Sequence, residues 1–336
     1  MILLIGGSSF IGVHTVNELL LQGCKVAVTC RNDKFRNYYE GLGVEYYNLD
    51  ISEEKDFHSL PKNGIDSVIL LAGLLPANCE VDLDKDDNAA EYFMINTLGT
   101  IYLLEYCRKN GINKIISTCS YQDVIKSWRT YPPLEDDAPR SCNYSGDHAV
   151  YVFSKNAAND MLEYYNSQHN MSNVIFRLPP VYGAGPHLTY CINGKRTKSA
   201  IAKFMEAASK GEPIYIFDGD ENYIRDYIYV KDVARALYMA SVSDKAKGLY
   251  NMTSGVGVSF AQQIRVIADV FAEGKKSPII NSTRLAGSHV SNVFSMEKAL
   301  KDFGFRPEYS SFRKMMEDYK EDLKQGLYSD LFGIYL

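Results

Sequence analysis

The chain has 336 residues, 46% of them hydrophobic, a length that allows one large α/β domain or two intimately joined ones. A formal net charge of −5 does not suggest a nucleic-acid-binding surface, and no apolar run approaches the length of a membrane span. The seven cysteines include no C-x-x-C pair, and the first strand begins at Met1, so we expect a reduced, cytoplasmic protein without a signal peptide or a structural metal site.

A glycine-rich turn follows the first apolar run. Residues Ile2–Ile5 have the length and composition of a β-strand, and a helical pattern begins after Gly6–Gly12. A strand that enters a helix through such a turn lets the backbone approach a pyrophosphate at the helix N-terminus. The same pattern also fits an ordinary tight turn, so it needs a second signal before it indicates function.

Strands and helices alternate along the first half of the chain. We expect strands at residues 25–30, 44–49, 67–72, 114–120 and 173–178. A helical pattern covers 91–110, and another follows the strand at 114–120. This alternation predicts an α/β fold, a Rossmann-type doubly wound parallel sheet with helices on both faces. After Pro179-Pro180 the pattern changes, and segments 183–186 and 194–198 are predicted as a loop entering a smaller, mixed C-terminal region.

Tyr151 and Lys155 form the most informative pair in the sequence. They lie four residues apart in a helical pattern, so both side chains occupy one face of the helix. An ammonium beside a phenol favours the phenolate, which lets the tyrosine act as a base nearer to neutral pH than its usual pKa of about 10. Because the chain has 25 tyrosines, chance pairs at this spacing are common, and the pair gains weight from the glycine-rich turn.

Together the two motifs resemble the extended short-chain dehydrogenase/reductase family, in its nucleotide-sugar epimerase/dehydratase group. The family's Gly-x-x-Gly-x-x-Gly appears as Gly6, Ser9 and Gly12, with Ser9 in place of the middle glycine. The resemblance implies that the dinucleotide contacts Gly6, Ser9, Phe10, Ile11 and Gly12. It also implies a dinucleotide-binding domain at 1–178 with about 227–251, and a substrate-binding region at 179–226 and 252–336.

Other segments resemble the parts of the family that contact the cofactor. These residues are Asp50, Ile51, Ala72, Gly73 and Asn96. The end of the second strand departs from the NAD pattern, in which an acid holds the ribose 2′-hydroxyl. Cys30 stands there, followed by Arg31, which could neutralise a 2′-phosphate. We therefore expect NADP to be favoured over NAD, with the alternative that Arg31 simply faces solvent.

The resemblance implies a serine or threonine at the end of the fifth strand that hydrogen-bonds the substrate oxygen. Counting the strand from Gly111 places Ser120 there, and a different count places Thr118; we prefer Ser120. Tyr151 would be the acid/base. Lys155 would lower the pKa of Tyr151 and bind the nicotinamide ribose.

Residues 225–232 closely resemble the family segment whose arginine grips the diphosphate of a nucleotide sugar with its forked donors. Arg225 takes this role, and Arg284 is a candidate for a second diphosphate arginine. Tyr215 or Phe217 could flank the nucleotide base, although both also fit an ordinary buried strand.

Pro180 stands where the family often has an asparagine that contacts the sugar diphosphate. Proline offers no backbone donor, so a standard UDP- or dTDP-sugar is less strongly expected. The Asp-Glu pair that a 4,6-dehydratase needs is also missing after the fifth strand.

The residues present favour a C4 epimerase that works through a 4-keto intermediate. An NADPH-dependent nucleotide-sugar ketoreductase or reductase-epimerase needs the same set, with Cys119 and His187 as a possible extra acid/base pair. A non-catalytic NAD(P)-binding scaffold or redox sensor is the alternative from another class, although such proteins usually lack the tyrosine or the lysine. Helical segments 91–108 and 151–168 correspond to the pair that meets its copy in this family, so we expect a homodimer.

Overall fold

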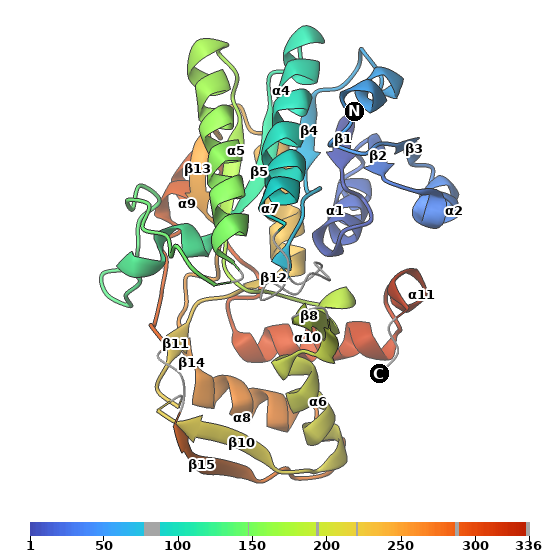
Figure 1. Ribbon diagram of the computed structural model, residues 1–336. Helices are drawn as coiled ribbons and strands as arrows, with labels where there is room; N and C mark the ends of the chain where they lie inside the picture. The colour runs from blue at the N-terminus through green and yellow to red at the C-terminus, as the bar shows by residue number, and fades with distance from the viewer. Residues whose placement is uncertain (77–87, 147, 193–194, 220, 286–288, 334–336) are drawn as a thin grey trace.

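A seven-stranded parallel sheet lies at the centre of the larger of the two regions of the protein (Figure 1). The computed structural model describes residues 1–76, 88–146, 148–192, 195–219, 221–285 and 289–333. The strand order is β13-β6-β5-β4-β1-β2-β3. The bounds are β1 Ile2–Ile5, β2 Val26–Cys30, β3 Glu45–Asn48, β4 Ser67–Leu70, β5 Ile115–Ser120, β6 Val174–Leu178 and β13 Gly248–Asn251. The predicted doubly wound parallel sheet is therefore confirmed.

Helices cover both faces of the sheet. Helices α1 (Phe10–Leu21) and α7 (Val230–Val242) pack on one face, and α4 (Gly99–Lys109) and α5 (Ala149–Gln168) pack on the other. Shorter helices complete this half: η1 Asp33–Phe35, α2 Arg36–Gly41, η2 Glu54–Ser59, α3 Ala89–Tyr92, η4 Phe93–Leu98, η5 Tyr121–Ser127 and α9 Glu297–Phe303. Because both faces of the sheet centre are buried, strands β1, β2 and β4 are buried along their whole length and do not alternate between buried and exposed residues.

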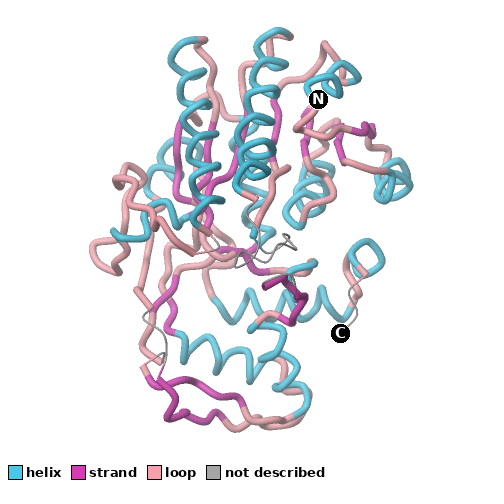
Figure 2. Tube along the Cα trace, viewed as in Figure 1, coloured by secondary structure: helices cyan, strands magenta, loops and turns pink. Residues whose placement is uncertain are grey.

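A smaller region of helices and two-stranded sheets lies beyond the carboxyl ends of the strands (Figures 1 and 2). Its sheets pair β7 (Val181–Tyr182) with β12 (Ile228–Tyr229) and β10 (Ile214–Asp218) with β15 (Ile279–Leu285) in parallel. The antiparallel pairs are β8 (Thr189–Ile192) with β9 (Lys195–Lys198), and β11 (Ile224–Arg225) with β14 (Val258–Ser259). The helices are η6 Pro186–Leu188, α6 Ala200–Lys210, α8 Phe260–Val270, α10 Phe312–Lys324 and α11 Ser329–Phe332.

One local prediction was wrong. The basic segment predicted as a loop contains strand β9, because residues 189–192 give it an antiparallel partner just before it. The helical pattern predicted at 91–110 is confirmed, with the π-helical turn η4 between α3 and α4. Such π-turns occur often at functional sites, and η4 contains Asn96. None of the helices in the described ranges is long and apolar enough to cross a membrane.

Candidate active site

The turn from β1 into α1 is packed so closely that side chains are excluded. Gly6 has φ +97°, and a Cβ there would lie 2.4 Å from the backbone nitrogen of Ala72. A Cβ on Gly12 would lie 2.5 Å from the carbonyl oxygen of Gly6. Ser9 caps α1, because its Oγ accepts a hydrogen bond of 3.0 Å from the Gly12 backbone nitrogen. The turn therefore leaves the backbone at the helix N-terminus open to a close-approaching phosphate.

Asn96 ties the neighbouring loop to helix α5. Its Oδ1 accepts from the Leu74 nitrogen at 2.8 Å, and its Nδ2 donates to the Leu74 carbonyl at 3.1 Å. The same Nδ2 donates to Ser154 Oγ at 3.0 Å, within the turn that separates Tyr151 from Lys155. Gly73 faces this amide, since a Cβ there would lie 3.0 Å from Asn96 Oδ1. The structure thus brings the predicted residues Ala72, Gly73 and Asn96 beside the glycine turn.

Asp50 and Ile51 follow β3 at the same edge of the sheet. Asp50 Oδ1 accepts from the Ser52 backbone nitrogen at 3.0 Å and from Ser52 Oγ at 2.7 Å. Ile51 is buried against Gly99, where a Cβ would lie 2.9 Å from the isoleucine side chain. Both residues hold the turn after β3 through these internal contacts.

Cys30 ends β2 and is buried, and burial raises the pKa of its thiol. Arg31, the next residue, is exposed. In the part of the chain that the structure describes, its guanidinium has no acidic partner. The end of β2 therefore presents an uncompensated positive charge and no carboxylate.

Tyr151 and Lys155 share the inner face of α5, as the spacing predicts. Burial raises the pKa of Tyr151, and Cys119 and Tyr92 act in the same direction. Burial lowers the pKa of Lys155 to about 8. Among the described residues, no hydrogen bond joins the two side chains, and desolvation is the largest influence on the pKa of each. That Lys155 lowers the pKa of Tyr151 stays a prediction.

The end of β5 brings Cys119 close to this pair, where its thiol acts on the pKa of both side chains. Side chains alternate along a strand, and Cys119 packs in the core on the face that α5 covers. Ser120 Oγ instead accepts from the Gln122 nitrogen at 3.2 Å and caps η5. Thr118, one residue before Cys119, points to the opposite face of the sheet. Counting in steps of two from Ile115 could have identified Cys119 from the sequence.

Cys119 is a poor nucleophile in this setting. Burial and the nearby Asp123 raise the pKa of its thiol to about 12. Its proposed partner cannot be assessed, since the side chain of His187 lies outside the described part of the chain. No three His, Cys, Asp or Glu side chains of the described residues are grouped to hold a metal ion.

Arg225 lines a cavity of about 170 Å³ in the smaller region. Its Nε and Nη2 donate to the hydroxyl of Tyr223 at 3.1 and 2.8 Å, and Tyr121 and Tyr182 lie close to the guanidinium. Aromatic and aliphatic side chains form most of the wall: Tyr182, Ile201, Phe204, Tyr223, Phe260, Ile264 and Ile267. No carboxylate within the described ranges pairs with Arg225, so the site has a partly buried cation suited to an anionic ligand.

The remaining substrate predictions do not join Arg225. Tyr215 is 54% exposed and Phe217 is 38% exposed, and neither lines the cavity. Strand β10 pairs with β15 on the far side of α8 from the large sheet (Figure 1), which explains their exposure. The side chain of Arg284 lies outside the described part of the chain.

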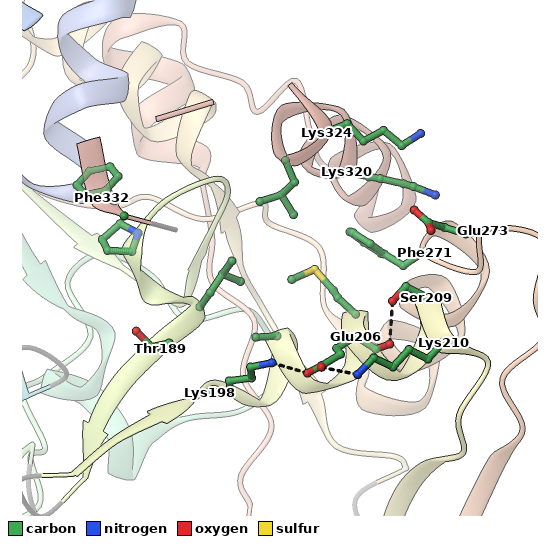
Figure 3. Close-up of a pocket in the computed structure, with 16 residues that line it drawn as sticks. Thr189, Lys198, Glu206, Ser209, Lys210, Phe271, Glu273, Lys320, Lys324 and Phe332 are labelled. Carbon is green, nitrogen blue, oxygen red and sulfur yellow. Dashed lines mark hydrogen bonds and ion pairs between the residues drawn. The ribbon is translucent and has the colours of Figure 1, made fainter. Parts of the chain in front are cut away.

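A larger hollow of about 960 Å³ lies between α6 and α10 (Figure 3). Lys198 and Lys210 both pair with Glu206, at 2.6 and 2.7 Å, and Lys320 donates to the Val270 carbonyl at 2.8 Å. These lysines are therefore already partnered, and neither Tyr151 nor Arg225 lines the hollow. It is separate from the candidate active site.

Known proteins resemble this chain along most of its length. UDP-glucose 4-epimerase of Halalkalibacterium halodurans is 28% identical over 331 residues, covering 94% of this chain and 93% of that protein. The solved UDP-glucose 4-epimerase of Thermus thermophilus, in complex with NAD, is 26% identical with a TM-score of 0.71, covering 95% and 99% of the two chains. The Thermotoga maritima UDP-glucose 4-epimerase structure with UDP-glucose has a TM-score of 0.75 at 23% identity, covering 97% and 99%.

The family assignment rests on a match that is much longer than any single motif. Residues 2–253 match the NAD dependent epimerase/dehydratase family, a span that includes the glycine turn, the Tyr151–Lys155 pair and Arg225. This match confirms the resemblance inferred from the turn and the pair. The chain belongs to the NAD dependent epimerase/dehydratase family.

Proposed function

We propose that the protein is a nucleotide-sugar 4-epimerase that acts on a UDP-hexose with the help of a nicotinamide dinucleotide. One observation carries the proposal: the end of β5 contacts both halves of the site. Cys119 lies by Tyr151 and Lys155, and Tyr121, two residues later, lies by Arg225. A proton-transfer group and an anion-binding group thus share one strand end. The names of the relatives, UDP-glucose 4-epimerase, supply the sugar and the base of the proposal.

The glycine turn fits a dinucleotide, because Gly6 and Gly12 let β1 turn tightly into α1 against the backbone of Ala72, which is the close packing that a pyrophosphate site at a helix N-terminus requires. When bound, the nicotinamide would supply the hydride acceptor and donor. Lys155 would bind the nicotinamide ribose, and Tyr151 would remove and return the proton of the sugar 4-hydroxyl. Arg225 would anchor the diphosphate, so that the 4-keto sugar can turn and present its other face.

Cofactor choice rests on the end of β2. We infer a preference for NADP from the absence of a carboxylate at Cys30 and from the exposed, unpaired guanidinium of Arg31 in the described structure. The family description and the Thermus thermophilus complex both name NAD. A titration of both dinucleotides therefore decides between them.

Arg31 at the end of β2 also fits a second function, the NADPH-dependent reduction of a nucleotide 4-keto sugar. Pro180 supports it, because the loop after β6 lacks the side chain expected for a standard substrate. Burial raises the pKa of every cysteine thiol that the structure describes, which disfavours a redox-sensor function for these five residues: Cys24, Cys30, Cys107, Cys119 and Cys142.

The test is a panel of UDP-glucose, UDP-galactose, UDP-N-acetylglucosamine and dTDP-glucose, each with NAD or NADP, followed by NMR of the sugar. An epimerase interconverts the 4-epimers without net consumption of dinucleotide. A reductase instead consumes NADPH in proportion to product from a 4-keto sugar. No conversion with either cofactor would contradict both functions.

We also propose the domain division and the dimer. Strand β13 pairs with β6, and α7 packs on α1, which supports assigning about 227–251 to the dinucleotide-binding domain. Phe93, Met94 and Tyr164 are 41%, 51% and 50% exposed on η4 and α5, which supports contact with a second copy through this face. Light scattering that shows only monomer at micromolar concentration would contradict the dimer.

A further inference from the structure

Three polar side chains form a row on the inner face of α5. Tyr151, Lys155 and Asn159 follow one another at intervals of four residues, one helical turn apart. Cys119 lies against this row from β5, close to Lys155. Lys155 is 6% exposed, Asn159 1% and Cys119 3%, so the C-terminal end of the row is buried.

The Asn159 amide is unusual because it is buried without its normal partners. Neither its Nδ2 nor its Oδ1 has a hydrogen-bond partner among the described residues. An unsatisfied buried polar group costs about 1–3 kcal/mol, so a leucine of similar size would be expected there if packing alone mattered. The Lys155 ammonium, one turn away, also lacks a hydrogen-bond or ion-pair partner within the described structure.

Among the residues that the structure describes, none gives Lys155 a counter-ion. Cys119 on β5 is the titratable group that acts on it, and burial raises the pKa of that thiol to about 12, so it is uncharged near neutral pH. Tyr151, one turn earlier on α5, is likewise kept neutral because burial raises its pKa. The carboxylate that acts on Cys119 is Asp123 on η5, and it is held by Arg177 on β6 through bonds of 2.8 and 3.0 Å. Arg177 therefore neutralises the carboxylate of Asp123, so Asp123 does not act as a counter-ion for Lys155.

We propose that Asn159 and Cys119 form a neutral polar backing for Lys155, which orients the ammonium toward Tyr151 and the dinucleotide without neutralising its charge. A carboxamide can accept from an ammonium through Oδ1 while donating through Nδ2, and it adds no charge. A carboxylate at this place would hold the ammonium in an ion pair and compete with the phenolate of Tyr151. Asn159 and Cys119 are thus positioning residues, and the inference rests on the proposed function of Lys155.

The test compares Asn159→Asp with Asn159→Leu, two variants of nearly the same size. The readouts are the dissociation constant of the dinucleotide and kcat/KM, each measured as a function of pH. Dinucleotide affinity and kcat/KM should both fall as pH rises through the Lys155 pKa of about 8, because the ammonium is the form that binds the dinucleotide. This fall is the alkaline limb of the pH profile. A carboxylate at 159 should raise the pKa of Lys155 by about 1–3 units, so the alkaline limb should move to higher pH. Leucine at 159 increases the desolvation of the ammonium, which should lower the pKa and move the limb to lower pH.

A control variant separates a charge placed next to Lys155 from a charge placed elsewhere on α5. Asn156→Asp puts the same charge on the neighbouring face of α5, where the amide contacts Cys142, and should move the limb less than Asn159→Asp. An alkaline limb that stays in place in both Asn159 variants, with melting temperatures like the wild type, would overturn the proposal. So would an equal movement in Asn156→Asp.

Cys119 provides an independent route if the Asn159 variants do not fold. Cys119→Ser keeps a polar group and should retain the wild-type limb, whereas Cys119→Ala should behave like Asn159→Leu. Identical profiles for serine and alanine would count against a role for the thiol. Dinucleotide binding is measured without turnover, so an inactive wild type would refute the proposed epimerase function while the backing of Lys155 is still tested.

Discussion

The two halves of the candidate site are held in different ways. At the dinucleotide end, Gly6 and Gly12 leave no room for a single added carbon atom, so the backbone itself defines the shape. At the substrate end, Arg225 is held by side chains, with Tyr223 accepting two hydrogen bonds and Tyr121 and Tyr182 close by. We infer that the first half is sensitive to volume and the second to chemistry, and the following predictions test this contrast.

Tyr151 stands where the two halves meet, and its replacement should have the largest effect. Tyr151→Phe removes the proton donor and acceptor and should lower turnover by at least about 10²-fold, the usual scale for a lost general acid/base. Binding of dinucleotide and of UDP should survive, because neither half depends on the phenol. Steady-state kinetics with equilibrium titrations measure this, and near-normal turnover would remove Tyr151 from the mechanism.

Arg225→Ala should affect the substrate half alone. Hydrogen bonds to charged groups contribute about 1.5–3 kcal/mol, so UDP affinity should fall roughly ten- to a hundredfold. Dinucleotide affinity should stay within about twofold, since the glycine turn is unchanged. Calorimetry with both ligands checks this, and Tyr223→Phe serves as a control that keeps the guanidinium but loses its hydroxyl partner. Equal losses for both ligands would mean that the halves are not independent.

Arg31→Ala tests chemistry within the dinucleotide half. Loss of a charge-assisted bond to the 2′-phosphate should weaken NADP roughly ten- to a hundredfold and leave NAD nearly unchanged. Cys30→Asp should move the preference toward NAD. Both cofactors are titrated into each variant after bound nucleotide is stripped. Tighter NAD binding by the wild type would show that the NADP preference is wrong.

Gly12→Ala tests volume in the same half. Its Cβ would lie 2.5 Å from the Gly6 carbonyl oxygen and 2.7 Å from Ser9 Oγ, so the turn must shift. Overpacking of this kind costs about 1–3 kcal/mol, and both stability and dinucleotide affinity should fall. Gly41→Ala is the matched control, because an added Cβ there meets nothing within 4 Å. Urea unfolding and dinucleotide titration should separate the two variants.

Lys155→Met should stabilise the protein while it destroys activity. The pKa of Lys155 falls from 10.5 to about 8 on folding, so the buried charge destabilises the folded state at neutral pH. The gain, about 1–3 kcal/mol, should be complete below pH 8 and should fade as pH rises through 10.5, above which the wild-type lysine is neutral in both states. Thermal melts across this range measure it, and a gain independent of pH would point to packing instead.

Local patterns were enough to predict the sheet and the two motifs. Strand length, apolar composition and a glycine turn are properties of adjacent residues, so the predicted strands match β1 to β6 within a residue or two. The spacing of Tyr151 and Lys155 likewise placed both on one helix face, since α-helix geometry repeats every 3.6 residues. The family match over residues 2–253 agrees with what these short segments indicated.

Tertiary structure decided the environment of each group. No local pattern shows that Cys119 lies opposite Lys155 and Asn159, because the contact joins β5 to a helix that starts 30 residues later. Nor does the spacing of Tyr151 and Lys155 reveal that burial outweighs their mutual attraction, since desolvation depends on what packs around them. The sequence determined which residues we propose for the chemistry, and long-range packing determined their burial and their partners.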